Sequence, residues 1–155
     1  MLKYIGIFLI FLSLIFPIFE YKSKGRKIFS EYAYFSRLLG EIISTIQLMR
    51  PIGEVVRGSD TSDVLHIMKS GSELLSEPRR VADSLSMPTS LKEATFSYFS
   101  SLGDGSRTEE LLRARSLLSD IESAEKSERE AREVGFRVRG ALFVGIGLML
   151  VIILV

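Results

Sequence analysis

Three residues near the middle of the chain could bind a metal ion: Asp60, Asp63 and His66, each three positions after the one before. On a helix this spacing would bring two carboxylates and an imidazole to one side, and such groups bind divalent metals. The two aspartates also suit turn and capping roles in the segment GSDTSD, which would leave His66 half-buried on a short helix. We favour the turn and capping roles and predict no metal site.

Catalysis by one of the serines would need a base, and His66 is the only histidine of the chain. No G-x-S-x-G segment is present to support a nucleophilic serine. The segment LGDGS at 102–106 superficially resembles a phosphate loop, but no strand is expected before it and it lacks the lysine of such loops. We therefore predict that the protein is not an enzyme and holds no cofactor.

The composition narrows the possible partners. The chain has 155 residues, a formal net charge of +1 and no cysteine. Because no basic stripe with interleaved aromatic residues is present, we expect no nucleic-acid partner. The lack of cysteine excludes disulfides and thiolate metal sites. The length suits one domain between two apolar ends.

Both ends of the chain predict membrane anchors. Residues 1–20 hold one lysine and then read YIGIFLIFLSLIFPIF, which predicts a transmembrane helix. A secretory signal peptide is the alternative, but no small-x-small cleavage site follows the apolar run. Residues 140–155 hold no charged side chain and would span about 24 Å as a helix. Entry of Val138 would lengthen this span while Arg137 and Arg139 reach the headgroups; a buried C-terminal helix is the alternative.

The region between the anchors, residues 21–139, is predicted to be a cytoplasmic domain. Lysines and arginines follow the first anchor directly, at Lys22, Lys24, Arg26 and Lys27, and others precede the second anchor. The positive-inside rule places the side that is richer in these residues in the cytoplasm. Both chain ends would then lie across the membrane.

The clearest periodicity predicts a long helix over residues 28–49. Its apolar residues alternate between spacings of four and three, which is the 3.5-residue repeat of a helix packed along its length against another. Pro51 should end this helix. The predicted seam consists of Ile28, Tyr32, Phe35, Leu39, Ile42, Ile46 and Met49.

A second long helix is predicted to return from the tip to the membrane. Ser106 with Glu109 fits a capping box at its start, and Ser90 with Glu93 fits another at the start of a shorter helix. The seam of the returning helix is predicted at Leu111, Ala114, Leu118, Ile121 and Ala124. The predicted fold class is therefore all-α: a cytoplasmic helical bundle with two long antiparallel helices and short helices at the tip, flanked by N- and C-terminal transmembrane helices. The arrangement of the short helices over 51–88 stays open.

Small residues in the second anchor predict a packing face. Ala141 and Gly145 form a small-xxx-small pair, and Gly147 extends it. Such residues let another membrane helix approach closely, with the first anchor as the obvious partner. Since these residues are common in membrane helices in general, their ordinary occurrence remains the alternative.

Several short motifs occur in a distinctive order between the two anchors. They are the opening MLKYIG, Leu39 with Glu41 and Ile42, then Pro51, Ile52, Glu54 and Val56, then Phe99 with Leu102 and Gly103, and the closing RVRGALFVGIGLMLVIILV. In this order they resemble the stage III sporulation protein AB family of endospore-forming bacteria, from end to end of the chain. The family pattern continues after Gly103 with an Asp and then a Gln, where this chain has Ser106 and Glu109.

The resemblance implies a non-enzymatic platform component of the channel that connects mother cell and forespore during sporulation. The family is similar to the inner-membrane platform protein of type II secretion and type IV pilus systems, whose cytoplasmic helical domains engage an assembly ATPase. The implied location is the cell membrane, as the mother-cell or outer forespore membrane. The implied partners are the other sporulation-channel membrane proteins, the ATPase and the lipid bilayer.

By the same analogy, a small set of residues would face the partners: Glu41, Pro51, Glu54, Leu102 and Gly103. A membrane-anchored helical sensor or adaptor that acts through dimerisation is the alternative function, and a homo-oligomer stays open in both cases. Association with the sporulation channel would favour the platform over the adaptor.

Overall fold

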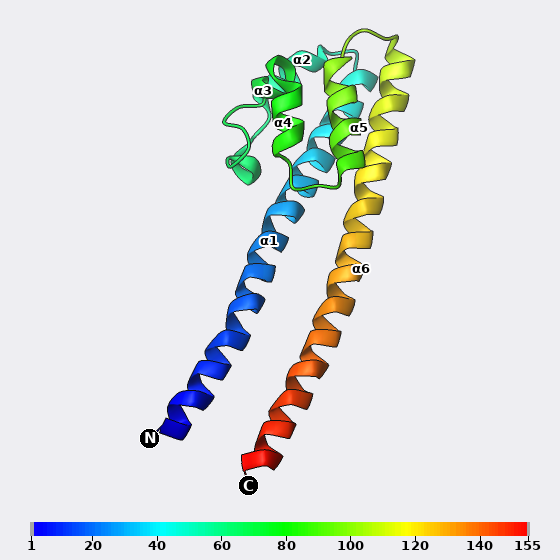
Figure 1. Ribbon diagram of the computed structural model, residues 1–155. Coiled ribbons are helices and arrows are strands. Elements are labelled where there is room, and N and C mark those ends of the chain that lie inside the picture. The colour runs from blue at the N-terminus through cyan, green and yellow to red at the C-terminus, as the bar shows by residue number, and fades with distance from the viewer. Residues whose placement is uncertain (1, 155) are drawn as a thin grey trace. The chain divides into compact units, whose positions relative to one another are not determined.

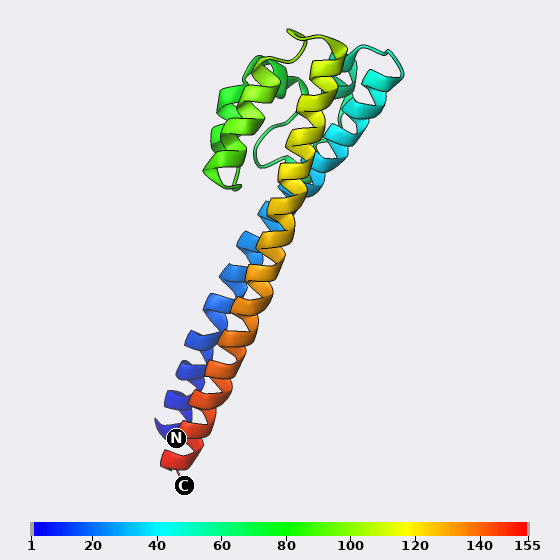
Figure 2. The ribbon, with the colours of Figure 1, turned by 90° about the vertical axis from the view of Figure 1, so that its right-hand side faces the viewer.

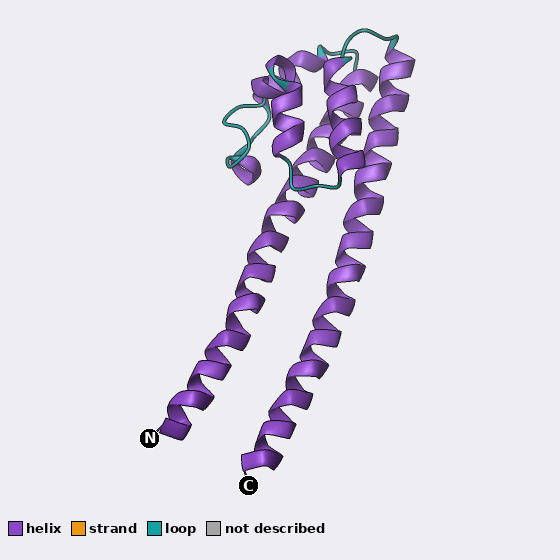
Figure 3. Ribbon diagram, viewed as in Figure 1, coloured by secondary structure: helices purple, strands orange, loops and turns teal. Residues whose placement is uncertain are grey.

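A computed structural model describes the backbone of residues 2–154, and the side chains of residues 25–138 together with those at 141, 142, 145 and 149. Its elements are α1 (Leu2–Gln47), α2 (Ile52–Gly58), the 3₁₀ helix η1 (Ser62–Val64), α3 (Ser72–Ser76), α4 (Pro78–Ser84), α5 (Thr89–Ser100) and α6 (Arg107–Leu154) (Figure 1). No strand occurs among the described residues, as Figure 3 shows. The all-α prediction is therefore confirmed.

The chain divides into two units, Met1–Ile121 and Glu122–Val155, with α6 passing from the first into the second. In the first unit, α1 runs toward the end where the short helices gather, and α6 starts from that end in the opposite direction (Figure 1). This agrees with the predicted antiparallel directions of the two long helices.

The seam predicted on α1 forms the core of the first unit. Tyr32, Phe35, Leu39 and Ile42 are completely buried, and Ile28 and Ile46 are each 7% exposed. A stripe beside it is buried as well, at Tyr34 and Leu38. The Phe35 ring lies 5.1 Å from that of Tyr34 and 6.2 Å from that of Phe99, so α1 and α5 meet through aromatic side chains.

Met49 does not belong to the seam, contrary to the prediction. The α-helix ends at Gln47, and Met49 has a φ of 59° and is 75% exposed. The Arg50 N–H donates to the Thr45 carbonyl at 3.0 Å and the Met49 N–H to the Ile46 carbonyl at 3.2 Å, which is the pattern of a left-handed C-terminal cap. The helix closes just before Pro51, so the last seam position turns out to solvent.

Helix α2 and the 3₁₀ helix η1 pack against α1, while α3 and α4 pack against other short helices and α5. Each contributes at least one buried apolar side chain: Val56 from α2, Val64 from η1, Leu74 from α3 and Val81 from α4. At Gly71, a Cβ atom would lie 1.9 Å from the Val56 carbonyl oxygen, so only glycine fits between α2 and α3. Helices α4 and α5 lie side by side, which Figures 1 and 2 show from two directions.

One predicted capping box is confirmed and the other is wrong. The Ser106 N–H donates to Glu109 Oε2 at 2.8 Å, and the Glu109 N–H donates to Ser106 Oγ at 3.3 Å, directly before α6. Helix α5 instead begins at Thr89 after Pro88, with no side-chain cap. Glu93 accepts from Arg79 Nη1 at 2.9 Å, so its carboxylate joins α4 to α5.

The seam predicted on α6 is confirmed at Ala114 and Ile121, but Leu117 takes the buried place that was predicted for Leu118. Ala114, Leu117 and Ile121 are buried, at 0%, 4% and 0% exposure, whereas the predicted Leu111 and Leu118 are half-buried at the border of this face. The buried face of α6 follows the 3.5-residue spacing at Glu110, Ala114, Leu117 and Ile121. The apolar pattern does not predict this face in full, because its first residue, Glu110, is acidic. Ala124, also predicted for the seam, is half-buried in the second unit.

The second unit is a single run of helix. Its first half carries ion pairs four residues apart: Glu125 to Arg129 at 2.6 Å, Glu128 to Arg132 at 2.7 Å, and Glu133 to Arg137. Each such pair adds about 0.2–0.5 kcal/mol to an isolated helix.

Within the described part of the chain, no helix is both long enough and apolar enough to cross a membrane. The side chains of the predicted anchor at 1–20 lie outside the description, as do most of those at 140–155. Of the predicted packing face, Ala141 is exposed and nothing lies within 4 Å of a Cβ built on Gly145, while Gly147 lies outside the described side chains.

Candidate partner-binding surface

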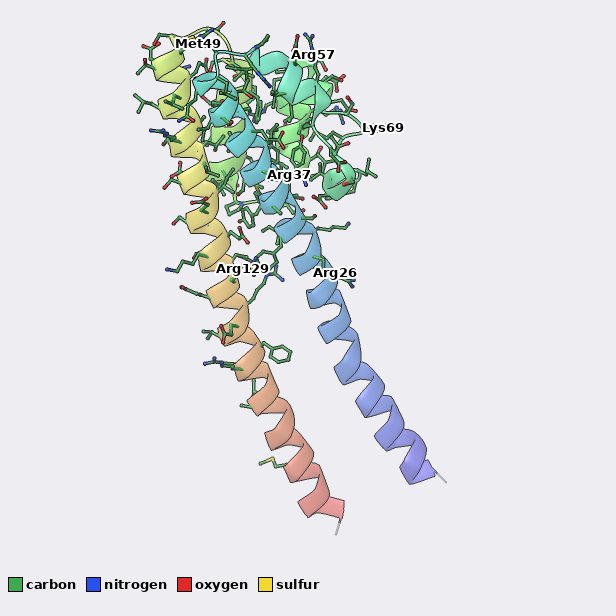
Figure 4. All side chains as sticks on the ribbon, turned by 180° about the vertical axis from the view of Figure 1, so that it is seen from behind. Arg26, Arg37, Met49, Arg57, Lys69 and Arg129 are labelled. Carbon is green, nitrogen blue, oxygen red and sulfur yellow. The ribbon has the colours of Figure 1, made fainter. Side chains whose placement is uncertain are left out.

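Of the five predicted partner-facing residues, all but Glu41 lie at one end of the first unit. This end is formed by the last turn of α1, by α2 and by the turn between α5 and α6 (Figure 1). We call it the tip and define it as residues 48–58 and 101–106. Figure 4 shows Met49 and Arg57 at this same end.

Four of the five predicted residues are accessible to a partner. Pro51, Glu54 and Gly103 are exposed at the tip, and Glu41 is exposed on the last turns of α1. Leu102 is half-buried, so it contributes partly to the core beneath the turn. Pro51 has an extended backbone before α2, and Glu54 lies in the first turn of that helix, where an acidic side chain is favourable.

The turn that carries Leu102 and Gly103 is held from below by Glu110. Gly103 has a φ of 96°, a conformation that glycine adopts without strain. Its N–H donates to Glu110 Oε1 at 2.9 Å, and Glu110 is only 4% exposed. Gly103 is therefore required by the backbone, whether or not a partner touches it.

Tyr98 lies near Glu110 and has no hydrogen bond for its hydroxyl. Among the described residues, Tyr98 Oη and Glu110 Oε2 are both buried without a partner. Burial raises the pKa of Tyr98, and the charge of Glu110 raises it further. The start of α6 thus rests on a polar cluster that the fold leaves incompletely paired.

The three candidate metal ligands do not converge. Asp60 Oδ1 accepts the Ser62 N–H at 2.9 Å, and the hydrogen bonds from Ser62 lower the pKa of Asp60. Asp63 lies 3.4 Å from Arg37 of α1, and His66 Nε2 lies 3.3 Å from Glu31 Oε1. No cluster that could hold a metal occurs among the side chains that the structure describes. The turn role is confirmed for Asp60, whereas the capping role is not, because Thr61 is the N-cap residue of η1 and no side chain caps that helix.

Glu31 is a buried polar residue with a structural role that the sequence analysis did not predict. It lies in the middle of α1 and is completely buried. Its Oε2 accepts the Ser86 N–H at 2.7 Å, and its Oε1 faces His66. It therefore joins α1 to two loops of the first unit. The signal was present in the spacing, since Glu31 is three residues after Ile28 and four before Phe35, but a lone acid within that stripe is normally assigned to solvent.

The tip carries two exposed apolar side chains that the sequence analysis did not predict there. Leu48 is 62% exposed and Met49 is 75% exposed, beside each other at the end of α1. Together with exposed Pro51, these two side chains give the tip an apolar surface that is accessible to a partner.

Comparison with known protein families, with curated proteins and with solved structures finds no match to this chain.

Proposed function

We propose that this protein is a non-enzymatic platform component of a secretion-like complex, the channel between mother cell and forespore in sporulation. In this proposal the two chain ends, residues 1–20 and 140–155, anchor it in the membrane as transmembrane helices. The helical domain between them lies in the cytoplasm and engages an assembly ATPase and other channel proteins. The motif order that resembles the stage III sporulation protein AB family supports this proposal.

The observation that carries the proposal is the composition of the tip. Exposed apolar side chains, Leu48 and Met49, lie next to exposed Pro51 and Glu54 on well-packed helices. Met49 also keeps a left-handed backbone, which costs a non-glycine residue roughly 1–2 kcal/mol. The two backbone hydrogen bonds of the helix cap hold this conformation, so Leu48 and Met49 keep a fixed, exposed position at the tip.

The membrane part of the proposal is supported by the charges beside the predicted anchors. Arg26 and Lys27 are exposed on α1 soon after the first apolar segment, and Arg137 is exposed on α6 just before the second. Basic residues at these positions favour the cytoplasmic side of a membrane. The topology can be measured directly because the chain has no cysteine. In the single-cysteine variant Ser90→Cys, we expect an impermeant maleimide to label the protein only after the cells are opened. Labelling in intact cells would contradict the proposed orientation.

The partner proposal is tested by crosslinking the full-length protein in membranes of sporulating host cells and identifying what co-purifies. Recovery of the channel proteins and their ATPase is expected. Glu54→Ala should then reduce recovery of the ATPase, because the substitution removes an exposed charge at the tip without touching the core. Glu130→Ala is the matched control, since Glu130 is an exposed acid of the second unit.

Recovery of the protein alone, crosslinked to itself, would overturn the platform proposal and favour the membrane-anchored adaptor that acts through dimerisation. Equal recovery of the ATPase with Glu54→Ala and with Glu130→Ala would remove Glu54 from the interface.

A further inference from the structure

A groove of about 540 Å³ lies between α5 and α6, and of its lining residues Ser101 belongs also to the tip. Its walls are equivalent two-turn faces of the two helices, because each helix contributes positions i, i+3, i+4 and i+7. The lining residues are Ala94, Ser97 and Tyr98 from α5 with its C-cap residue Ser101, and Arg113, Ser116, Leu117 and Asp120 from α6.

The groove is shaped by small side chains. Ala94, Ser97, Ser101 and Ser116 form its walls, while Tyr98 and Leu117, 5% and 4% exposed, form its floor. Helices pack by placing ridges of side chains into grooves of this kind. A third helix that contributes one large apolar side chain would therefore fill the groove and contact Tyr98 and Leu117.

The two ends of the groove carry opposite charges. Arg113 lies at one end, oriented across the groove by its hydrogen bond from Nη1 to Ser101 Oγ at 3.3 Å. Asp120 lies seven residues later on α6, about 10.5 Å along the helix, and has no ion pair among the described side chains. A guanidinium keeps further N–H donors after one bond. The groove can therefore recognise an acid at one end and a base at the other.

We propose that this groove binds an amphipathic helix of a partner protein, in which an acidic and a basic residue two turns apart flank a large apolar residue. The acid pairs with Arg113, the base pairs with Asp120, and the apolar side chain packs on Leu117. This inference rests on the proposed platform function and assigns one of its contacts to a specific surface.

A second copy of the chain does not satisfy the same charges. Arg113 would meet Asp120 of another copy only if the two α6 helices ran antiparallel. Copies anchored in one membrane as proposed share the direction of α6, so a symmetric contact through this face would bring Arg113 against Arg113. The charge pattern therefore favours a different protein as the occupant.

The direct test uses three fluorescent synthetic helical peptides, with full-length protein in lipid nanodiscs and empty nanodiscs as background. All carry a central leucine, and their two flanking charges are Glu and Lys, Lys and Lys, or Glu and Glu. Replacing an attractive contact by a repulsive one changes an exposed pair by about 1 kcal/mol, so the Glu and Lys peptide should bind about fivefold more tightly than either other peptide. Equal affinity for all three would overturn the charge assignment.

Two substitutions sharpen the test. Arg113→Glu leaves acids at both ends, so the preferred peptide should become the one with two lysines. Ser116→Phe fills the groove and should weaken binding at least tenfold, whereas Ser119→Phe, at an exposed neighbouring position outside the groove, should leave it unchanged. Circular dichroism checks that both phenylalanine variants fold. Unchanged binding by Ser116→Phe would overturn the proposal.

The same variants separate this inference from the platform proposal. If wild-type protein recovers the channel proteins and Ser116→Phe recovers them equally well, the groove is not the contact although the platform proposal stands. If wild-type protein recovers no channel protein, the platform proposal fails, and the peptide affinities still decide what the groove binds.

Discussion

Removing the carboxylate of Glu31 should destabilise the first unit more than any exposed substitution on α1. Its Oε2 accepts the Ser86 N–H at 2.7 Å, and its Oε1 lies 3.3 Å from His66 Nε2, in a site with no solvent exposure for Glu31. Glu31→Ala removes both acceptors and leaves the Ser86 N–H without its partner. The loops at residues 66 and 86 would then lose their polar attachment to α1.

The expected loss is about 3 kcal/mol. A hydrogen bond to a charged group contributes roughly 1.5–3 kcal/mol, and truncation of the fully buried Glu31 side chain also removes its packing and its contact with His66. For a unit of this size, 1 kcal/mol corresponds to about 4–8 °C in Tm. A loss of about 3 kcal/mol therefore predicts a decrease of about 15 °C.

The measurement is thermal unfolding of the full-length protein in detergent, followed by near-ultraviolet circular dichroism. This signal reports on the buried tyrosines, because the chain has no tryptophan. Glu31→Gln keeps a side-chain acceptor for Ser86 and should lose only about 1 kcal/mol. Glu41→Ala, an exposed acid on the same helix, should stay within about 0.5 kcal/mol of wild type. If Glu31→Ala melted together with Glu41→Ala, the buried carboxylate would have no structural role and the reasoning would be refuted.

Changes at three further sites test other parts of the fold. Tyr98→Phe should raise stability by about 1 kcal/mol, because it removes a buried hydroxyl without a partner; it should also reduce the loss of stability above pH 10, since the pKa of Tyr98 is raised in the folded state and its contribution is lost as pH rises. Met49→Gly should add about 1 kcal/mol by relieving the left-handed backbone, and Met49→Ala should not. Ser106→Ala should cost about 1 kcal/mol. Because hydrogen bonds from Ser106 lower the pKa of Glu109, the stability that this carboxylate contributes should be present above about pH 4.5 and be lost at lower pH, and Glu109→Gln should remove that dependence. Thermal unfolding measured across pH tests these changes. A Met49→Gly variant no more stable than Met49→Ala would contradict the strain at Met49. A loss of stability at low pH that Glu109→Gln leaves unchanged would contradict the role of the Glu109 carboxylate.

The long helices could be predicted because their signals are local. The 3.5-residue spacing on α1 depends only on which residues are apolar, and Ser106 with Glu109 needs only four consecutive positions. The prediction failed at Met49 because a helix end depends on backbone hydrogen bonds such as that from Arg50 to Thr45, which apolar spacing does not report. The capping box predicted at Ser90 and Glu93 was wrong for a related reason. Pro88 is the N-cap residue of α5, and Glu93 binds Arg79 of another helix.

The missed residues depend on contacts between distant parts of the chain. Glu31 and Ser86 are joined only after α1 and the α4–α5 loop have packed, and Gly71 is required only because Val56 lies against it. The groove also depends on such contacts, because the small residues of α5 and α6 form its walls only when the two helices lie side by side. One sequence supplies the residue types for such sites but not their pairing.

The groove and the core share side chains, and this makes the groove a rigid surface. Tyr98 forms part of the groove floor, and its ring lies 5.1 Å from Phe99, which in turn lies 6.2 Å from Phe35 in the seam of α1. Leu117 of the floor belongs to the buried face of α6. A partner helix would therefore meet side chains that packing already holds in place, so little conformational entropy is lost on binding. The apolar floor can then provide affinity while Arg113 and Asp120 select the orientation, a division of roles that a mobile loop could not maintain.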